Sequence, residues 1–101
     1  MENGLDRGSV KKILVTADIV PQYMKKLEQL AELAGWIKTG ILLSEEEQIV
    51  SLKGVDVYLV GYEQVGERVI AGARDLKLVA CARANPVNVD SGALTSRNIP
   101  L

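Results

Sequence analysis

The sequence predicts an α/β fold in which helices cover both faces of a parallel β-sheet. Short apolar runs rich in β-branched residues alternate with segments whose apolar residues recur every three or four positions. The short connections between them are typical of βαβ units with right-handed crossovers. The best match is the flavodoxin-like three-layer sandwich, with strand order 2-1-3-4-5 and a truncated fifth strand.

The chain begins with a polar stretch and then enters its first strand. Residues 1–10 contain glycine and show no periodicity, so we expect a flexible tail. Residues 11–101 are long enough for one domain with a single core. Lys11–Ala17 is a short apolar run bounded by charged residues, which predicts a buried parallel strand.

A helix and an edge strand are expected next. Pro21 suits the first turn of a helix, because its missing N–H would be unpaired there. The helix is expected to continue to about Ala34 and to end at Gly35. Its apolar stripe comprises Met24, Leu27, Leu30, Ala31 and Ala34. Trp36–Thr39 is then predicted to be a short strand at the sheet edge.

A capping box marks the second helix. Ser44 can accept from the N–H of Glu47 while the Glu47 side chain reaches back to Ser44. A metal-binding carboxylate cluster is the alternative interpretation of these acids, and the capping box favours a solvated helix start. Gly54 is expected to end the helix. The residues expected to dock it are Ile49, Val50 and Leu52.

Two further strands and a helix follow. Val55–Val60 is the predicted third strand and Leu76–Ala82 the fourth. Between them, Gly66–Arg74 is expected to be a helix. Its inward-facing residues are Val69, Ile70 and Ala73.

The last helix and the start of a fifth strand close the chain. Asn88 is a good N-cap for a helix over Val89–Arg97. Asn98 can take the left-handed conformation just beyond that helix. Ile99–Leu101 would then open the fifth strand.

The composition excludes several classes of function. A net charge of −1, with cations scattered among acids, gives no case for nucleic-acid binding. There is no secretory signal and no membrane-spanning apolar run, so we expect a cytoplasmic protein that does not bind a membrane. The chain has no histidine and a single cysteine, Cys81, which we expect to be an inert buried thiol. We expect no bound metal and no intrachain disulfide.

Several known functions of this architecture lack their motifs here. The third strand runs into Gly61 and Tyr62, so the phosphoacceptor aspartate of a receiver domain is missing. The residues after the first strand do not form a flavodoxin phosphate loop. Cobalamin binding of the familiar kind would need a histidine ligand. No Gly-x-Gly-x-x-Gly follows any strand, so the chain has no dinucleotide-binding half of its own.

The predicted ligand site is the crevice at the carboxyl ends of the strands. For strand order 2-1-3-4-5 it is lined by Ala17–Ile19, Gly61–Tyr62 and Arg83–Asn88. Free backbone N–H groups and a helix N-terminus there favour a carboxylate or phosphate. Arg83 would pair with such an anion or, in the alternative, brace the turn as a surface arginine. Asp18 would either contact a ligand or cap the following helix.

Four short motifs stand in a definite order along the chain. They are LKGVD at Leu52–Asp56, LKLV at Leu76–Val79, RANPVNVD at Arg83–Asp90 and RNIPL at Arg97–Leu101. Together they resemble the first lobe of the D-isomer-specific 2-hydroxyacid dehydrogenases, especially the phosphoglycerate dehydrogenase branch. The match covers roughly residues 12–101, and the ordered set is more specific than any single motif.

The resemblance implies a substrate-binding lobe that holds the carboxylate of a small 2-hydroxy or 2-keto acid. By position, the N–H groups of Ala84 and Asn85 would bind that carboxylate. Arg83 and Tyr62 are further candidates for substrate binding apart from the resemblance, because they follow the fourth and third strands at the predicted crevice. The family usually has glycines where Ala84 and Asn85 stand, and Pro86 has no N–H to offer. Asparagine tolerates positive φ, whereas Ala84 adds a Cβ where the ligand should approach.

The resemblance also implies that NAD binds to a second lobe. The family's catalytic arginine, its glutamate–histidine pair and its nucleotide fingerprint belong to that lobe, so we expect no catalytic residue and no bound cofactor in this chain. We expect the isolated chain to lack dehydrogenase activity and to self-associate through its exposed sheet edge as a homo-oligomer such as a dimer. The alternative is a non-enzymatic flavodoxin-like binding or assembly module.

Overall fold

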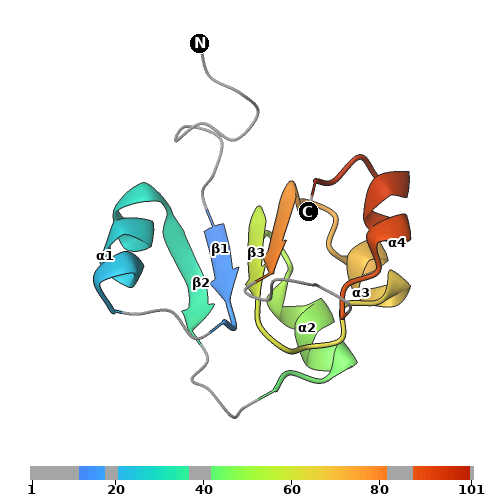
Figure 1. Ribbon diagram of the computed structural model, residues 1–101, viewed down its shortest axis with the longest axis horizontal. Helices are drawn as coiled ribbons and strands as arrows, with labels where there is room; N and C mark the ends of the chain where they lie inside the picture. The colour runs from blue at the N-terminus through green and yellow to red at the C-terminus, as the bar shows by residue number, and fades with distance from the viewer. Residues whose placement is uncertain (1–11, 18–20, 37–41, 82–87, 101) are drawn as a thin grey trace.

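The computed structural model describes residues 12–17, 21–36, 42–81 and 88–100. Four strands form one sheet in the order β2-β1-β3-β4, and every neighbouring pair is parallel (Figure 1). The strands are β1 (Lys12–Val15), β2 (Glu32–Trp36), β3 (Val57–Val60) and β4 (Leu78–Cys81). The predicted α/β class, the parallel pairing and the first four places of the strand order are confirmed.

The described residues do not form a fifth strand, but Pro100 lies where one was expected. The N–H of Val79 in β4 donates to the carbonyl of Pro100 at 3.1 Å. Val79 is paired by register with Tyr58 of β3 on the other side. Leu101 lies outside the described residues.

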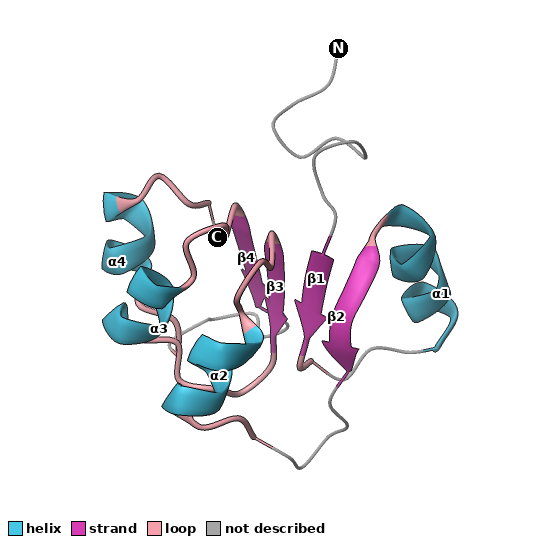
Figure 2. Cartoon of the chain, turned by 180° about the vertical axis from the view of Figure 1, so that it is seen from behind, coloured by secondary structure: helices cyan, strands magenta, loops and turns pink. Residues whose placement is uncertain are grey.

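Helices cover the two faces of the sheet unequally (Figure 2). One face packs on α1 (Pro21–Leu30), and the other packs on α2 (Glu45–Ser51), α3 (Glu67–Gly72) and α4 (Ser91–Ser96). Alternate residues of β1 show the division, because Ile13 and Val15 join the cluster of Met24 while Leu14 joins the larger cluster. The result is the predicted three-layer arrangement.

The boundary between α1 and β2 differs from the prediction. The helix ends at Leu30 rather than near Ala34, and the strand begins at Glu32 rather than Trp36. The cause is sheet pairing, since β2 pairs along β1 and brings Gly35 opposite Leu14. Leu30, expected in the apolar stripe, is 44% exposed. The helical spacing of apolar residues therefore continues beyond Leu30, but the residues from Glu32 onward are stabilised more by pairing with the central strand β1 than by extending the helix.

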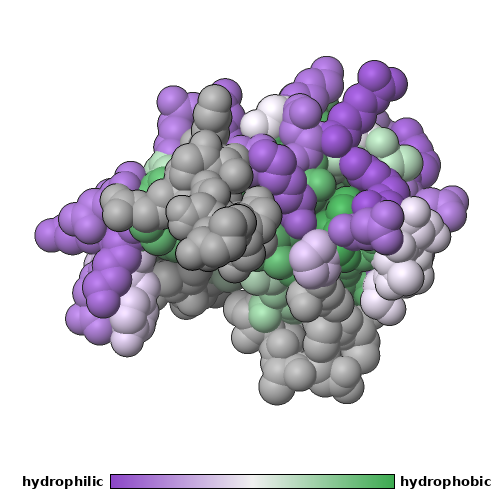
Figure 3. Space-filling view, turned by 90° about the horizontal axis from the view of Figure 1, so that it is seen from above, coloured by the Kyte–Doolittle hydropathy of each residue, from purple (hydrophilic) through white to green (hydrophobic). Residues whose placement is uncertain are grey.

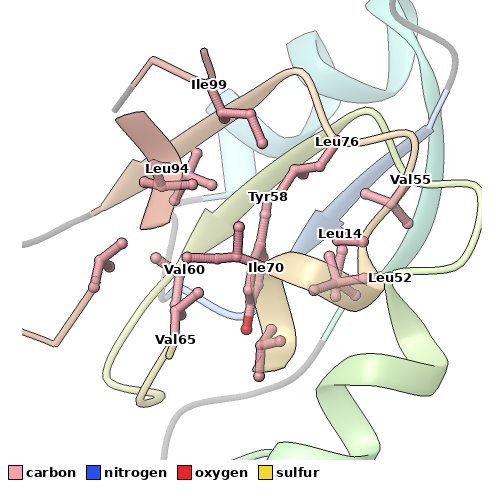
Figure 4. Close-up of a cluster of buried hydrophobic side chains, with 14 residues drawn as sticks. Leu14, Leu52, Val55, Tyr58, Val60, Val65, Ile70, Leu76, Leu94 and Ile99 are labelled. Atoms are coloured by element: carbon pink, nitrogen blue, oxygen red, sulfur yellow. The ribbon is translucent and has the colours of Figure 1, made fainter. Parts of the chain in front are cut away.

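The larger core cluster lies between the sheet and the three helices of one face (Figure 4). Leu52 and the predicted inward residues of α3 are buried. Val50 was expected to dock α2 but is 64% exposed. The buried residue of α2 is Gln48. Because its side chain is polar, the spacing of apolar residues did not identify it as inward-facing.

Three predicted helix-end signals are confirmed. Ser44 and Glu47 form the capping box of α2 through both reciprocal hydrogen bonds. Gly54 has a φ of 75° and Asn98 a φ of 57°, so both adopt the left-handed conformation expected after a helix.

The start of α4 was predicted wrongly. Asp90 rather than Asn88 is the N-cap, and its side chain accepts from the N–H of Ala93 at 3.0 Å. Asn88 is buried, with its side-chain amide turned toward the loop after β3.

Candidate ligand-binding crevice

All four strands run the same way, so their carboxyl ends meet at one edge of the sheet. Figure 3 views the molecule from the opposite edge, where the strands begin and polar side chains cover much of the visible surface. At the carboxyl edge, buried polar residues follow the strands. They are Thr16 after β1, Glu63 after β3 and Asn88 between β4 and α4.

Glu63 joins three segments of the chain. The N–H of Gly61 donates to the hydroxyl of Thr16 at 3.1 Å, and that hydroxyl donates to Oε1 of Glu63 at 2.8 Å. Oε2 of Glu63 accepts from the N–H of Leu43 at 3.2 Å. Glu63 is only 2% exposed. Its carboxylate therefore ties the ends of β1 and β3 to the segment that leads into α2, using neutral donors.

Asn88 joins the loop after β3 to the segment before α4. Its Nδ2 donates to the carbonyl of Gly61 at 3.1 Å and to that of Glu63 at 2.9 Å. The backbones run together as well, because Val65 accepts from the N–H of Asp90 and donates to the carbonyl of Asn88. Asn88 is thus the anchor at the carboxyl end of the segment that contains residues 82–87, which lie outside the described residues.

A second set of polar contacts joins β3, α2 and the loop after β3. The hydroxyl of buried Tyr58 donates to Oε1 of Gln48 at 2.9 Å, and Nε2 of Gln48 donates to the carbonyl of Gln64 at 3.0 Å. This link fixes α2 against the loop after β3. Among the described residues, no buried side-chain nitrogen or oxygen lacks a hydrogen-bond partner.

Tyr58 leads to a prediction about alkaline stability. Burial raises the pKa of its hydroxyl well above the ordinary value of 10.0, the charge of Glu63 adds to that rise, and the influence of the Thr16 side chain opposes it. The folded state therefore holds this proton more tightly than the unfolded state. Its contribution to stability is full below about pH 10 and is lost as the pH rises further.

We expect Tyr58→Phe to remove this dependence. Urea unfolding of both proteins at intervals between about pH 9 and pH 12 should give a shallower loss of stability in the variant. At neutral pH the variant should be about 1 kcal/mol less stable, because Gln48 loses a donor. Parallel curves for the two proteins over the alkaline range would contradict the assignment.

The polar network forms one wall of an open hollow of about 610 Å³. The hollow lies between the entry to α2, the loop after β3 and the segment before α4. Its described lining contains the apolar residues Leu42, Leu43, Val65 and Val89 and the acidic residues Glu45, Glu63 and Asp90. No lysine or arginine lines it among the described residues. A hollow with this mixed lining suits a small ligand that has both apolar and polar groups.

The predicted site residues are placed as follows. Tyr62 is 64% exposed and lines the hollow. Arg83, Ala84 and Asn85 lie outside the described residues, as does Asp18. Cys81 was expected to be buried but is half-buried, and its Sγ lies 3.7 Å from Oδ1 of Asn88.

Sequence reasoning missed Gln48 and Glu63 as members of the site. Neither residue belongs to a motif, and polar residues between apolar ones usually face solvent. In the described ranges, no group of three or more histidine, cysteine, aspartate or glutamate side chains could hold a metal ion. The helices that the structure describes are too short or too polar to cross a bilayer.

No protein-family model matches the sequence. A curated relative does, namely YoaD of Bacillus subtilis (strain 168), which bears the description 2-hydroxyacid dehydrogenase. The two are 32% identical over 94 residues, which cover 88% of this chain and 27% of YoaD. The chain therefore spans about a quarter of the length of this relative.

Solved structures show the same fold. A D-isomer-specific 2-hydroxyacid dehydrogenase, NAD-binding, from Polaromonas superposes with a TM-score of 0.80 at 22% identity, over 91% of this chain and 29% of that protein. The NAD⁺-bound 3-phosphoglycerate dehydrogenase of Entamoeba histolytica gives a TM-score of 0.71 at 20% identity, over 89% of this chain and 31% of that protein. The chain is thus similar to 2-hydroxyacid dehydrogenases in sequence and in fold.

Proposed function

We propose that this chain is the substrate-binding lobe of a D-isomer-specific 2-hydroxyacid dehydrogenase, an oxidoreductase of the phosphoglycerate dehydrogenase-like branch. The similarity to YoaD and the ordered motifs support the family. The parallel sheet of order β2-β1-β3-β4 supports the flavodoxin-like lobe. The coverage of about a quarter of YoaD agrees with one lobe of a two-lobe protein.

In this proposal the substrate is a small 2-hydroxy or 2-keto acid. Its carboxylate binds to the N–H groups of Ala84 and Asn85, with Arg83 and Tyr62 beside it. The observation that carries the proposal is the pair of hydrogen bonds from Asn88 to the carbonyls of Gly61 and Glu63. They anchor the end of the segment that contains these N–H groups at the carboxyl edge of the sheet, where open α/β sheets bind ligands.

The oxidation itself requires a partner lobe. NAD would accept the hydride from the C2 carbon of the hydroxy acid, and a protonatable group would take the hydroxyl proton. The 101 residues contain no histidine to act as that group. This lobe therefore contributes binding and orientation, and on its own it is expected to bind the acid without oxidising it.

The proposal is tested by titrating the ¹⁵N-labelled chain with D-glycerate and recording amide spectra. We expect shifts at residues 83–88 and at Tyr62. Asn85→Pro removes one of the two N–H groups and should weaken binding at least tenfold, whereas Asn85→Gly keeps the N–H and should bind as well as the parent chain.

A different pattern would overturn the proposal. If D-glycerate, D-lactate and their keto forms shift no amide signal at millimolar concentration, the substrate role is wrong. The non-enzymatic binding or assembly module would then be the better interpretation.

A further inference from the structure

Helix α1 presents large apolar side chains to solvent. Tyr23 is 52% exposed and Leu30 is 44% exposed. Half-buried Leu27 lies between them at helical spacing, so the three residues form a stripe along one side of the helix. The core receives only Met24 as a buried residue of α1. We call Tyr23, Leu27 and Leu30 the α1 stripe.

Positive charge lies beside the α1 stripe. Nζ of Lys26 is 5.7 Å from the centre of the Tyr23 ring, which is within range for a cation–π contact. Lys25 precedes Lys26 in the chain, and Glu28 is the only acidic residue of the helix. Helix α1 therefore offers an apolar surface next to a net positive charge.

Helix α2 offers a surface of the opposite charge. An open hollow of about 330 Å³ is lined by Leu43, Glu46, Glu47, Val50 and Ser51, and we call it the α2 groove. Val50 is 64% exposed, and the first turn of the helix contains three acids. Arg68 pairs with Glu45 and Glu46 and so offsets one of these three charges. The α2 groove thus combines apolar side chains with a net negative charge.

The α1 stripe and the α2 groove belong to helices on opposite faces of the sheet (Figures 1 and 2). They cannot meet within one chain, but they can meet between two copies. A contact of this kind leaves a free groove on one copy and a free stripe on the other. It can therefore repeat from copy to copy.

We infer that the α1 stripe of one copy docks in the α2 groove of a second copy of this chain. The stripe would cover Val50, and Lys26 would approach the carboxylates of Glu46 and Glu47. The occupant is a second copy because the apolar surface and the opposite charge that the groove requires are both present on α1. The inference is independent of the proposed function, since it involves no substrate.

This contact differs from the pairing of sheet edges that the sequence suggests. The edge at β4 is already used in part, because the N–H of Val79 donates to the carbonyl of Pro100. The stripe and the groove are instead formed by exposed side chains of two helices. Pairing at a sheet edge is the alternative that the variants below separate from the inference.

The contact is expected to be weak. The ten residues of α1 span about 15 Å, so each copy buries less than the roughly 800 Å² of a standard interface. We expect a dissociation constant on the order of 100 μM at low salt. Sedimentation velocity of the chain at increasing concentration should show a mass that rises past that of a dimer, and added salt should weaken the association.

Two exposed positions allow each surface to be blocked separately. Tyr23→Glu places an acid against the acidic groove, and Val50→Gln replaces the apolar centre of the groove with an amide. Each variant should associate at least tenfold more weakly than the parent chain. Gln22→Glu is the matched control for the first variant, because it adds the same charge to the same turn of α1 outside the stripe. It should associate as the parent chain does.

Mixing the two blocked variants tests the head-to-tail arrangement. The Val50→Gln chain retains an intact stripe, and the Tyr23→Glu chain retains an intact groove. An equimolar mixture should therefore form a one-to-one dimer with about the affinity of the parent contact. That dimer should not grow further, because its remaining stripe and groove are the blocked ones.

Three results would overturn the inference. The first is a parent chain that stays monomeric up to about 1 mM, well above the dissociation constant expected for a contact of this size. The second is association that Tyr23→Glu and Val50→Gln leave unchanged, or that Gln22→Glu weakens equally, which would place the contact elsewhere, such as at a sheet edge. The third is a mixture of the two folded variants that does not dimerise, which would mean that the stripe and the groove do not bind each other.

Discussion

Asn88→Ala is expected to lower the free energy of unfolding by about 3 kcal/mol. The variant removes the Nδ2 group that donates to the carbonyls of Gly61 and Glu63. Asn88 is 3% exposed, so the carbonyl of Glu63 would lose this donor in a place that water reaches poorly, and the carbonyl of Gly61 would keep only the thiol of Cys81, 3.9 Å away. Each unpaired buried group costs about 1–3 kcal/mol.

Urea unfolding followed by circular dichroism measures this loss. Gln64→Ala is the matched control, because Gln64 lies in the same loop, is exposed and gives Gln48 only its backbone carbonyl. The control should change stability by less than about 0.5 kcal/mol. A loss below about 1 kcal/mol for Asn88→Ala would mean that water replaces the amide, and Asn88 would then not be the anchor of the crevice.

Ligand binding should respond to the same change. In the proposed function, Asn88 acts by holding the end of the segment that carries Ala84 and Asn85. The variant should therefore bind D-glycerate more weakly than the parent chain even where it is fully folded. Equal affinities of the folded variant and the parent chain would separate the stability of this edge from its binding.

The sequence was sufficient for features that local signals specify. Parallel order follows from apolar runs that alternate with helical segments, and both were found in the predicted order, with the boundary between α1 and β2 as the exception. The capping box at Ser44 and the left-handed Asn98 depend on a few neighbouring residues, so their chemistry can be recognised without a fold.

Features that depend on distant contacts could not be predicted. Asn88 has the chemistry of an N-cap, but Asp90 caps the helix and Asn88 pairs with a loop 25 and 27 residues earlier in the chain. Glu63 pairs with Thr16 across 47 positions. Periodicity carries no information about such pairs. The predicted end of α1 was wrong for a related reason, because pairing with β1 determines where β2 begins.

Gly61→Val is expected to destabilise the chain by about 3 kcal/mol, and Gly61→Ala by about 1–2 kcal/mol. A Cβ on Gly61 would lie 3.1 Å from the carbonyl oxygen of Thr16 and 3.3 Å from Cα of Ala17. Both contacts are with backbone, which cannot move aside as a side chain can. The ends of β1 and β3 must therefore separate, and the effect arises from space rather than from a special φ.

Gly92→Ala is the control with the opposite expected sign. A Cβ there meets only Oδ1 of Asp90 at 3.4 Å, an ordinary contact, and the residue lies within α4. Alanine should stabilise that helix by about 0.5–1 kcal/mol. Urea unfolding of the three variants beside the parent chain gives the comparison.

Gly61→Ala also tests how the crevice is built. Separating β1 from β3 stretches the hydrogen bond from Gly61 to Thr16, and through Thr16 it shifts the carboxylate of Glu63. The folded Gly61→Ala variant should therefore bind D-glycerate more weakly than the parent chain, whereas the Gly92→Ala variant should bind it as the parent chain does. If Gly61→Ala loses stability but binds normally, the close approach of the strands serves packing alone, and the polar network is not what positions the ligand.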